Sequence, residues 1–190
     1  SKQGRKVLRG THVIRLVNKK TGKRVFVDPD QPNITAALFG KDGLLWRESA
    51  KMELMSQINM EVWDVVHRRR VPRAEKVLRS NWRLLVKRKR GKITKRKSRA
   101  FADGSTSIEG VHYERRDVHS PTPRTASFRM LVANSVQQDQ ELYSADVETA
   151  FLHCELPKRI YIECYKHAKL LLGDDIIFDD DVRLHLKKSV

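Results

Sequence analysis

The sequence predicts a mixed α/β protein in a chain of 190 residues. Two patterns predict this class. In one segment apolar residues recur every four positions, which is typical of a helix with one buried face. Other short segments alternate or run apolar between turn residues, as strands do. With 39% hydrophobic residues, the length allows one domain with a real core, or two small ones.

The N-terminal half shows a repeating helical pattern between shorter strand-like segments. Trp46, Ala50, Leu54 and Ile58 would share one side of a helix, because four residues make about one turn. The predicted elements, in order, are a small hairpin of residues 13–17 and 24–27, a linker over 28–33, a helix over 44–60 and a short strand over 62–66.

A long hairpin follows, and it is unusually basic. Residues 82–89 and 93–101 flank Gly91-Lys92, and two such runs across a turn containing glycine predict an antiparallel pair. Because cations lie on both of its faces, we expect the hairpin to project into solvent or onto a polyanion.

The C-terminal half is predicted to contain further helices and strands. Pro123 offers a helix start, and Phe128, Leu131, Val132 and Val136 would form one apolar face. The predicted elements are a helix over 125–138, strands over 142–147 and 159–164, a hairpin over 170–178 centred on Gly173-Asp174-Asp175, and a helix over 182–188.

Charge is high and unevenly distributed. The chain has 39 Lys and Arg against 23 Asp and Glu, and residues 68–99 alone contain 16 cations and one acid. Such a block indicates a polyanionic partner, most simply nucleic acid; a solvated face is the alternative. The cations expected to bind are Lys87, Arg88, Lys89, Arg90, Lys92, Lys95, Arg96, Lys97 and Arg99.

Composition also argues against a membrane protein and against a disulfide framework. No apolar run approaches the roughly 20 residues that span a bilayer, so no membrane partner is expected. Two cysteines favour a reducing, intracellular setting, with nucleus, cytoplasm and organelle left open. Residues 1–24 hold nine cations and no acid, which suits a basic arm or an organelle-targeting remnant.

Three carboxylates suggest a metal-dependent site. Asp146 ends a predicted strand, and Asp174 and Asp175 occupy the tip of a predicted hairpin. Carboxylates on neighbouring strand ends are what two Mg²⁺ ions need for nucleotidyl transfer. The alternative is that Gly173-Asp174-Asp175 is only a turn, because Asp and Gly favour turns for conformational reasons.

A zinc site is a further alternative. His153, Cys154, Cys164 and His167 are the right ligand types in the right number. The first pair is adjacent, however, and lacks the usual gap of two residues, so core histidines and cysteines are the simpler interpretation.

Several short motifs, in one consistent order, resemble the reverse transcriptase domain of Ty1/copia-type retrotransposons. Residues 146–152 read Asp-Val-Glu-Thr-Ala-Phe-Leu, where the family has Asp-Val-Lys-Thr-Ala-Phe-Leu. All three tryptophans fall on family positions. The other matching motifs are residues 46–54, 61–66, 80–87, 97–104, 109–113, 121–124 with Arg129 beyond, and 160–163.

The resemblance implies fingers with a basic hairpin followed by a truncated palm sheet. It implies that Asp146, Asp174 and Asp175 are the catalytic aspartates that hold Mg²⁺, if the chain is catalytic, and that Arg124 lies near nucleic acid. The expected regions are a basic arm and linker over 1–31, a fingers-like region over 32–140 and a palm-like region over 141–190.

One departure from the family bears on activity. The family places several tens of residues between the strand after the first aspartate and the Asp-Asp pair, whereas here 10 residues separate Glu163 from Asp174. We therefore expect an RNA-directed DNA polymerase domain by descent that binds nucleic acid, with RNA as the expected partner, without polymerising it. The alternative is a non-catalytic RNA-binding subunit of a large ribonucleoprotein such as a ribosome, with other protein subunits as partners.

Overall fold

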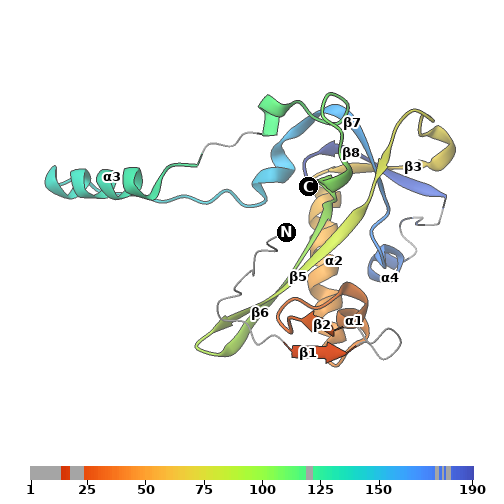
Figure 1. Cartoon of the computed structure of the whole chain (residues 1–190), viewed down its shortest axis with the longest axis horizontal. Coiled ribbons are helices and arrows are strands. Elements are labelled where there is room, and N and C mark those ends of the chain that lie inside the picture. The colour runs from red at the N-terminus through yellow and green to blue at the C-terminus, as the bar shows by residue number, and fades with distance from the viewer. Residues whose placement is uncertain (1–13, 18–23, 119–121, 174–175, 177, 179–180) are drawn as a thin grey trace.

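The computed structural model describes residues 14–17, 24–118, 122–173, 176, 178 and 181–190. It shows a mixed α/β fold in which one long helix, α2, packs along a two-stranded hairpin, and a separate four-stranded sheet lies beyond that hairpin (Figure 1). The helices are α1 (Ile34–Phe39), α2 (Gly43–Asn59), α3 (Thr125–Gln137) and α4 (Ala168–Leu172). The strands are β1 (Ile14–Val17), β2 (Arg24–Val27), β3 (Trp63–His67), β4 (Val77–Leu78), β5 (Ser80–Lys89), β6 (Lys92–Ala102), β7 (Glu155–Glu163) and β8 (Val182–Lys188).

Helix α2 confirms the four-residue periodicity of the sequence. Trp46, Ala50 and Leu54 are buried on one face, and Ile58 packs partly buried against the same core. The small hairpin is also confirmed, because β1 and β2 pair antiparallel. None of the helices in the described part of the chain is long and apolar enough to cross a membrane.

Strands β5 and β6 pair antiparallel from Ser80↔Ala102 to Lys89↔Lys92, in the region where the sequence predicts a hairpin. Its tip turns at Arg90 and Gly91, which have φ values of 51° and 78°. A two-residue hairpin turn with positive φ at both positions favours glycine, since glycine adopts this conformation without strain.

The four-stranded sheet has the order β3-β8-β7-β4. The helix predicted over residues 182–188 is wrong, because these residues form strand β8. Val182, Leu184 and Leu186 are buried, and the residues between them are not, which is the period of two of a strand with one covered face. The sheet takes strands from both sides of residue 140, and the three expected regions remain a prediction.

The hairpin predicted over residues 170–178 is wrong in its first strand, because residues 168–172 form a short helix, α4. Ala168, Leu171 and Leu172 are buried together at helical spacing against the core. A run of three leucines fits a buried strand or a buried helix equally well from sequence alone. Asp174 and Asp175, the predicted tip, lie outside the described residues.

Residues 122–151 form a projecting arm, which extends to the left in Figure 1. Its helix, α3, is present as predicted, but the face that contains Phe128, Leu131 and Val136 is exposed. The strand predicted over 142–147 is wrong, because this segment has no regular secondary structure. A strand needs a partner for its backbone groups, and the segment runs through solvent instead.

Candidate nucleic-acid interface

A stripe of polar residues on α2 fixes the hairpin to the body. Ser49, Glu53 and Gln57 are spaced four residues apart, next to the buried apolar face. Ser49 Oγ donates to Arg96 O at 3.0 Å, Ala100 N donates to Glu53 Oε1 at 3.3 Å, and Gln57 Nε2 donates to Ala100 O at 3.0 Å. These side chains form hydrogen bonds with backbone groups on the edge of β6 that faces away from β5, where they would otherwise be unpaired.

The hairpin has one covered and one open face. Leu84, Ser98 and Ala100 are buried. Because side chains alternate along a strand, the neighbouring positions point to the opposite, open face. That face carries five cations and no acid: Arg83 and Lys87 from β5, and Lys95, Lys97 and Arg99 from β6.

Like charges lie directly opposite one another on this face. Arg83 pairs in register with Arg99, and Lys87 with Lys95. Such cross-strand pairs destabilise a sheet. Repulsion by Arg99, followed by partial burial, lowers the pKa of Lys97 below its usual value. The hairpin therefore concentrates positive charge, and a bound polyanion would relieve the repulsion.

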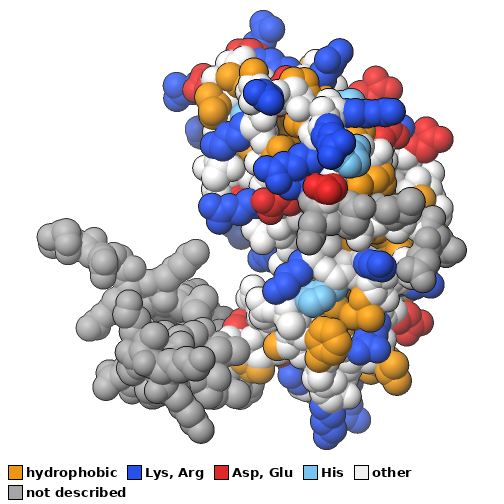
Figure 2. All heavy atoms as spheres, turned by 90° about the vertical axis from the view of Figure 1, so that its right-hand side faces the viewer, with side chains coloured by type: hydrophobic (Ala, Val, Ile, Leu, Met, Phe, Trp, Pro, Cys, Tyr) orange, Lys and Arg blue, Asp and Glu red, His pale blue; other side chains and the backbone are white. Residues whose placement is uncertain are grey.

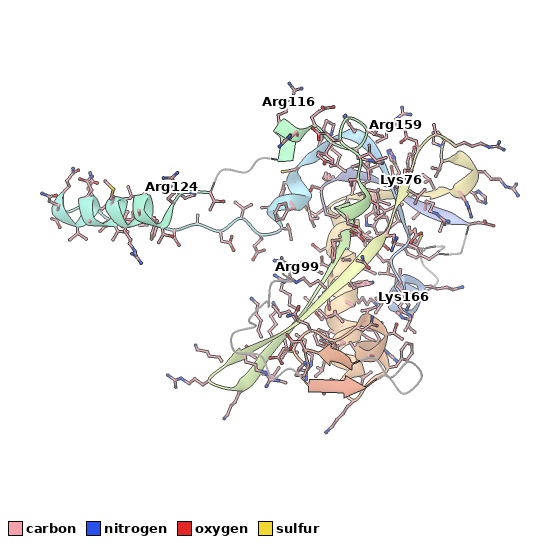
Figure 3. The ribbon with its side chains drawn as sticks, viewed as in Figure 1. Lys76, Arg99, Arg116, Arg124, Arg159 and Lys166 are labelled. Atoms are coloured by element: carbon pink, nitrogen blue, oxygen red, sulfur yellow. The ribbon has the colours of Figure 1, made fainter. Side chains whose placement is uncertain are left out.

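The structure separates the predicted cations into distinct groups. Arg96 turns inward and pairs with Asp42 at 2.8 Å. Arg88 pairs with Asp30 at 2.9 Å, and this hydrogen-bonded pair raises the pKa of Arg88. Lys89, Arg90 and Lys92 are exposed at the tip. Arg124 lies on the projecting arm, away from the hairpin that holds Arg99 (Figure 3).

Sequence reasoning missed Arg83. The sequence contains a signal for it: Arg83 and Lys87 are four residues apart on one predicted strand, so their side chains lie on the same face. The pairing with Arg99 also depends on the register of the hairpin, which the two-residue turn fixes.

A groove of about 890 Å³ lies between α2, β6 and residues 146–151. It brings Asp146 beside the β6 cations Lys97 and Arg99, as part of one surface. Glu53, which also lines the groove, has a raised pKa, because burial outweighs its hydrogen bond to Ala100 and the attraction of Arg99.

The described residues do not assemble a metal site. Asp146 is exposed, and it lies in a segment without regular secondary structure. Among the residues with described positions, no three His, Cys, Asp or Glu side chains are grouped to hold a metal ion. Asp174 and Asp175 remain outside them, so Mg²⁺ binding by the three aspartates stays a prediction.

The alternative zinc set is also not assembled within the described part of the chain. Its members contact different neighbours. Cys154 Sγ lies 3.8 Å from Ala150 O, and Cys164 Sγ lies 3.5 Å from Val182 O. His167 Nε2 is 2.9 Å from the hydroxyl of Thr35.

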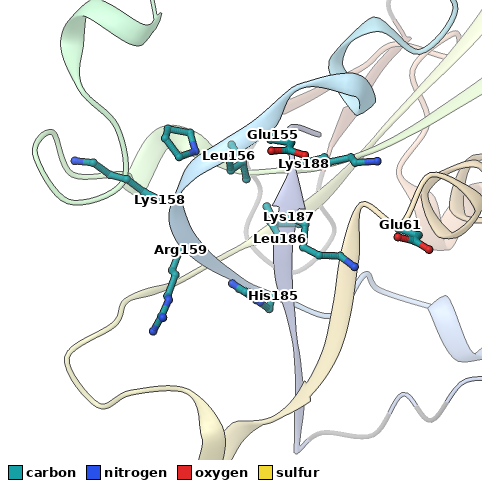
Figure 4. Close-up of a pocket in the computed structure, with 10 residues that line it drawn as sticks. Glu61, Glu155, Leu156, Lys158, Arg159, His185, Leu186, Lys187 and Lys188 are labelled. Atoms are coloured by element: carbon teal, nitrogen blue, oxygen red, sulfur yellow. The ribbon is translucent and has the colours of Figure 1, made fainter.

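A second hollow, of about 490 Å³, lies beside β7 and β8 (Figure 4). Its lysines are already engaged: Lys187 pairs with Asp64 at 3.0 Å, Lys158 pairs with Glu114, and Lys188 Nζ donates to Met60 O. On the side of the molecule in Figure 2, Lys and Arg likewise lie among acidic and hydrophobic side chains. The open hairpin face is thus the better candidate for binding a polyanion.

Comparisons with known proteins identify the family. A family model described as reverse transcriptase (RNA-dependent DNA polymerase) matches residues 60–169, and the chain belongs to this family. A curated relative, the retrovirus-related Pol polyprotein from transposon TNT 1-94 of Nicotiana tabacum, is 28% identical over 94 residues. That alignment covers 49% of this chain and only 7% of the polyprotein. No solved structure matches the chain.

These matches confirm the resemblance drawn from the motifs: the chain is a copia-type reverse transcriptase domain. The family match begins just before β3 and ends within α4, and so includes the whole β5–β6 hairpin and the arm.

Proposed function

We propose that this reverse transcriptase domain binds nucleic acid, RNA in preference, on the open face of the β5–β6 hairpin. The observation that carries the proposal is the set of five cations on that face without an acid. A phosphate backbone offers a row of negative charges, and a protein that neutralises them releases counterions. In this proposal the hairpin corresponds to the fingers of the family.

Removing two of these cations provides the first test. In Lys97→Ala/Arg99→Ala we expect RNA affinity to fall about 10-fold, taking roughly 0.7 kcal/mol for each exposed phosphate contact. The slope of log affinity against log salt should become shallower by about 1.4 for a single strand, since two phosphate contacts are lost. Fluorescence anisotropy of a labelled RNA across a salt series measures both quantities.

The matched control is Lys51→Ala/Lys166→Ala, which removes the same charge from exposed positions outside the hairpin face. If the control weakens binding as much as the hairpin variant does, binding depends on net charge alone and the assignment of the face is wrong. A parallel titration with DNA of the same sequence tests the preference for RNA.

We further propose that the described domain does not polymerise DNA on its own. Two features support this: Asp146 sits in an irregular exposed segment, and Glu163 is separated from Asp174 by only 10 residues. In a primer-extension assay with Mg²⁺ or Mn²⁺, we expect no product above background, and we expect Asp146→Asn to retain RNA binding. Extension that disappears in Asp146→Asn would show a working polymerase site instead.

A further inference from the structure

Helix α3 carries an apolar face that the described part of the molecule leaves open. Phe128, Leu131 and Val136 lie on one side of the helix and are 60%, 54% and 74% exposed. A helix of 13 residues is marginal in water unless one face is packed. The arm projects away from the body, so the body that carries it does not cover this face (Figure 1).

A second open apolar surface lies on the body. Leu45 and Met52 are exposed on the side of α2 opposite its buried face, two turns apart. Together with Val147 and Phe151, they line the groove of about 890 Å³ between α2, β6 and the base of the arm. The described part of the chain therefore holds a groove with an apolar strip, and a helix whose apolar face is exposed.

Two of the three walls of the groove are opposite in charge to the arm. Residues 122–138 of the arm contain Arg124 and Arg129 and no acid. The walls that α2 and residues 146–151 contribute to the groove carry only acids among their charged side chains, and its cations are confined to β6. The acids of these two walls are Glu48, Glu53, Asp146 and Glu148.

We propose that two copies of the chain associate by exchanging arms, with α3 of each copy seated in the groove of the other. The apolar face of α3 packs on Leu45 and Met52, and Arg129 lies toward the acidic walls. Lys95, Lys97 and Arg99 belong both to this groove and to the proposed RNA-binding face, so the exchanged helix and RNA compete for them. The base of the arm forms one wall of its own groove and leads α3 outward, which favours the groove of a second copy over its own. Exchange is reciprocal, so each dimer contains the contact twice, as a two-fold interface requires.

Two substitutions, one on each surface, test the exchange by sedimentation and light scattering on nuclease-treated full chain. We expect the unaltered chain to dimerise, and to remain dimeric at high salt because the contact is largely apolar. Leu131→Asp on α3 and Met52→Asp on α2 should each give a monomer. The control is Met130→Asp: Met130 is 73% exposed and lies on the opposite side of α3, so this variant should remain a dimer.

Mixing the two monomeric variants decides between the possible modes. Met52→Asp retains an intact α3 and Leu131→Asp retains an intact groove, so an equal mixture regains one of the two contacts and should form a heterodimer. A dimer of the Met52→Asp variant alone would mean that α3 pairs with α3, and would overturn the proposal. An unaltered chain that is monomeric at every concentration would overturn it too, whatever the variants do.

Discussion

Leu184→Ala is expected to lower the free energy of unfolding by about 2–5 kcal/mol, the usual range for truncating a fully buried leucine. Leu184 is completely buried in β8, between Val65 of β3 and Ile162 of β7 in the register of the sheet. Truncation removes apolar contacts and leaves a cavity that neighbouring strands cannot close without distorting their pairing. Urea unfolding followed by tryptophan fluorescence measures the loss.

Val65→Ala is the matched control, in the same sheet and opposite Leu184. Val65 is 38% exposed, so truncation removes fewer methyl contacts and we expect a loss below about 1 kcal/mol. Equal losses in the two variants would mean that Leu184 is not in a packed core, and would contradict the arrangement of β8 in the centre of the sheet.

Gln57→Leu is expected to lower the free energy of unfolding by about 2–6 kcal/mol, although leucine is close to glutamine in volume. Gln57 is 1% exposed; its Nε2 donates to Ala100 O at 3.0 Å, and its Oε1 accepts from Trp63 Nε1 at 2.9 Å. Leucine leaves the Trp63 donor and the Ala100 carbonyl without their partner in the core, at roughly 1–3 kcal/mol each. The residue links α2, β3 and β6, so the loss affects the attachment of the hairpin.

A double-mutant cycle separates the hydrogen bond from packing. Trp63→Phe removes the indole N–H, so Gln57→Leu should cost less in that background than in the unaltered chain. Additive effects would show that the bond between Gln57 and Trp63 contributes nothing, and that the loss in Gln57→Leu comes from shape alone.

The elements that could be predicted are those whose signal is local. The period of Trp46, Ala50 and Leu54 identifies α2, and Gly91 between two β-rich runs identifies the hairpin. The remaining errors have tertiary causes. Residues 142–147 have the composition of a strand but pair with no strand in the described part of the chain. The leucines before Gly173 form a short helix, α4, whose Leu171 and Leu172 are buried in the core.

For the candidate nucleic-acid interface, the sequence predicts most of the cations of the hairpin but not the face on which each of them lies. Nine cations of the hairpin region were identified from sequence, yet which face each occupies depends on what α2 covers. Arg96 therefore points toward Asp42, while Arg83 joins the open face. The contacts of Ser49, Glu53 and Gln57 with β6 could not be predicted for a related reason. Polar residues on a helix are usually exposed to solvent, and only the structure shows that the edge of a strand lies beside these three.

The strand order β3-β8-β7-β4 also constrains when the protein can fold during synthesis. Val65 pairs with Leu184, so β3 has no neighbour in its sheet until 119 further residues have been made. At roughly 5–20 residues per second, ribosomes need on the order of ten seconds for that distance. For this interval the nascent chain exposes an unpaired strand next to the large apolar residues of α2, and chaperones that bind such segments have time to act before the sheet closes.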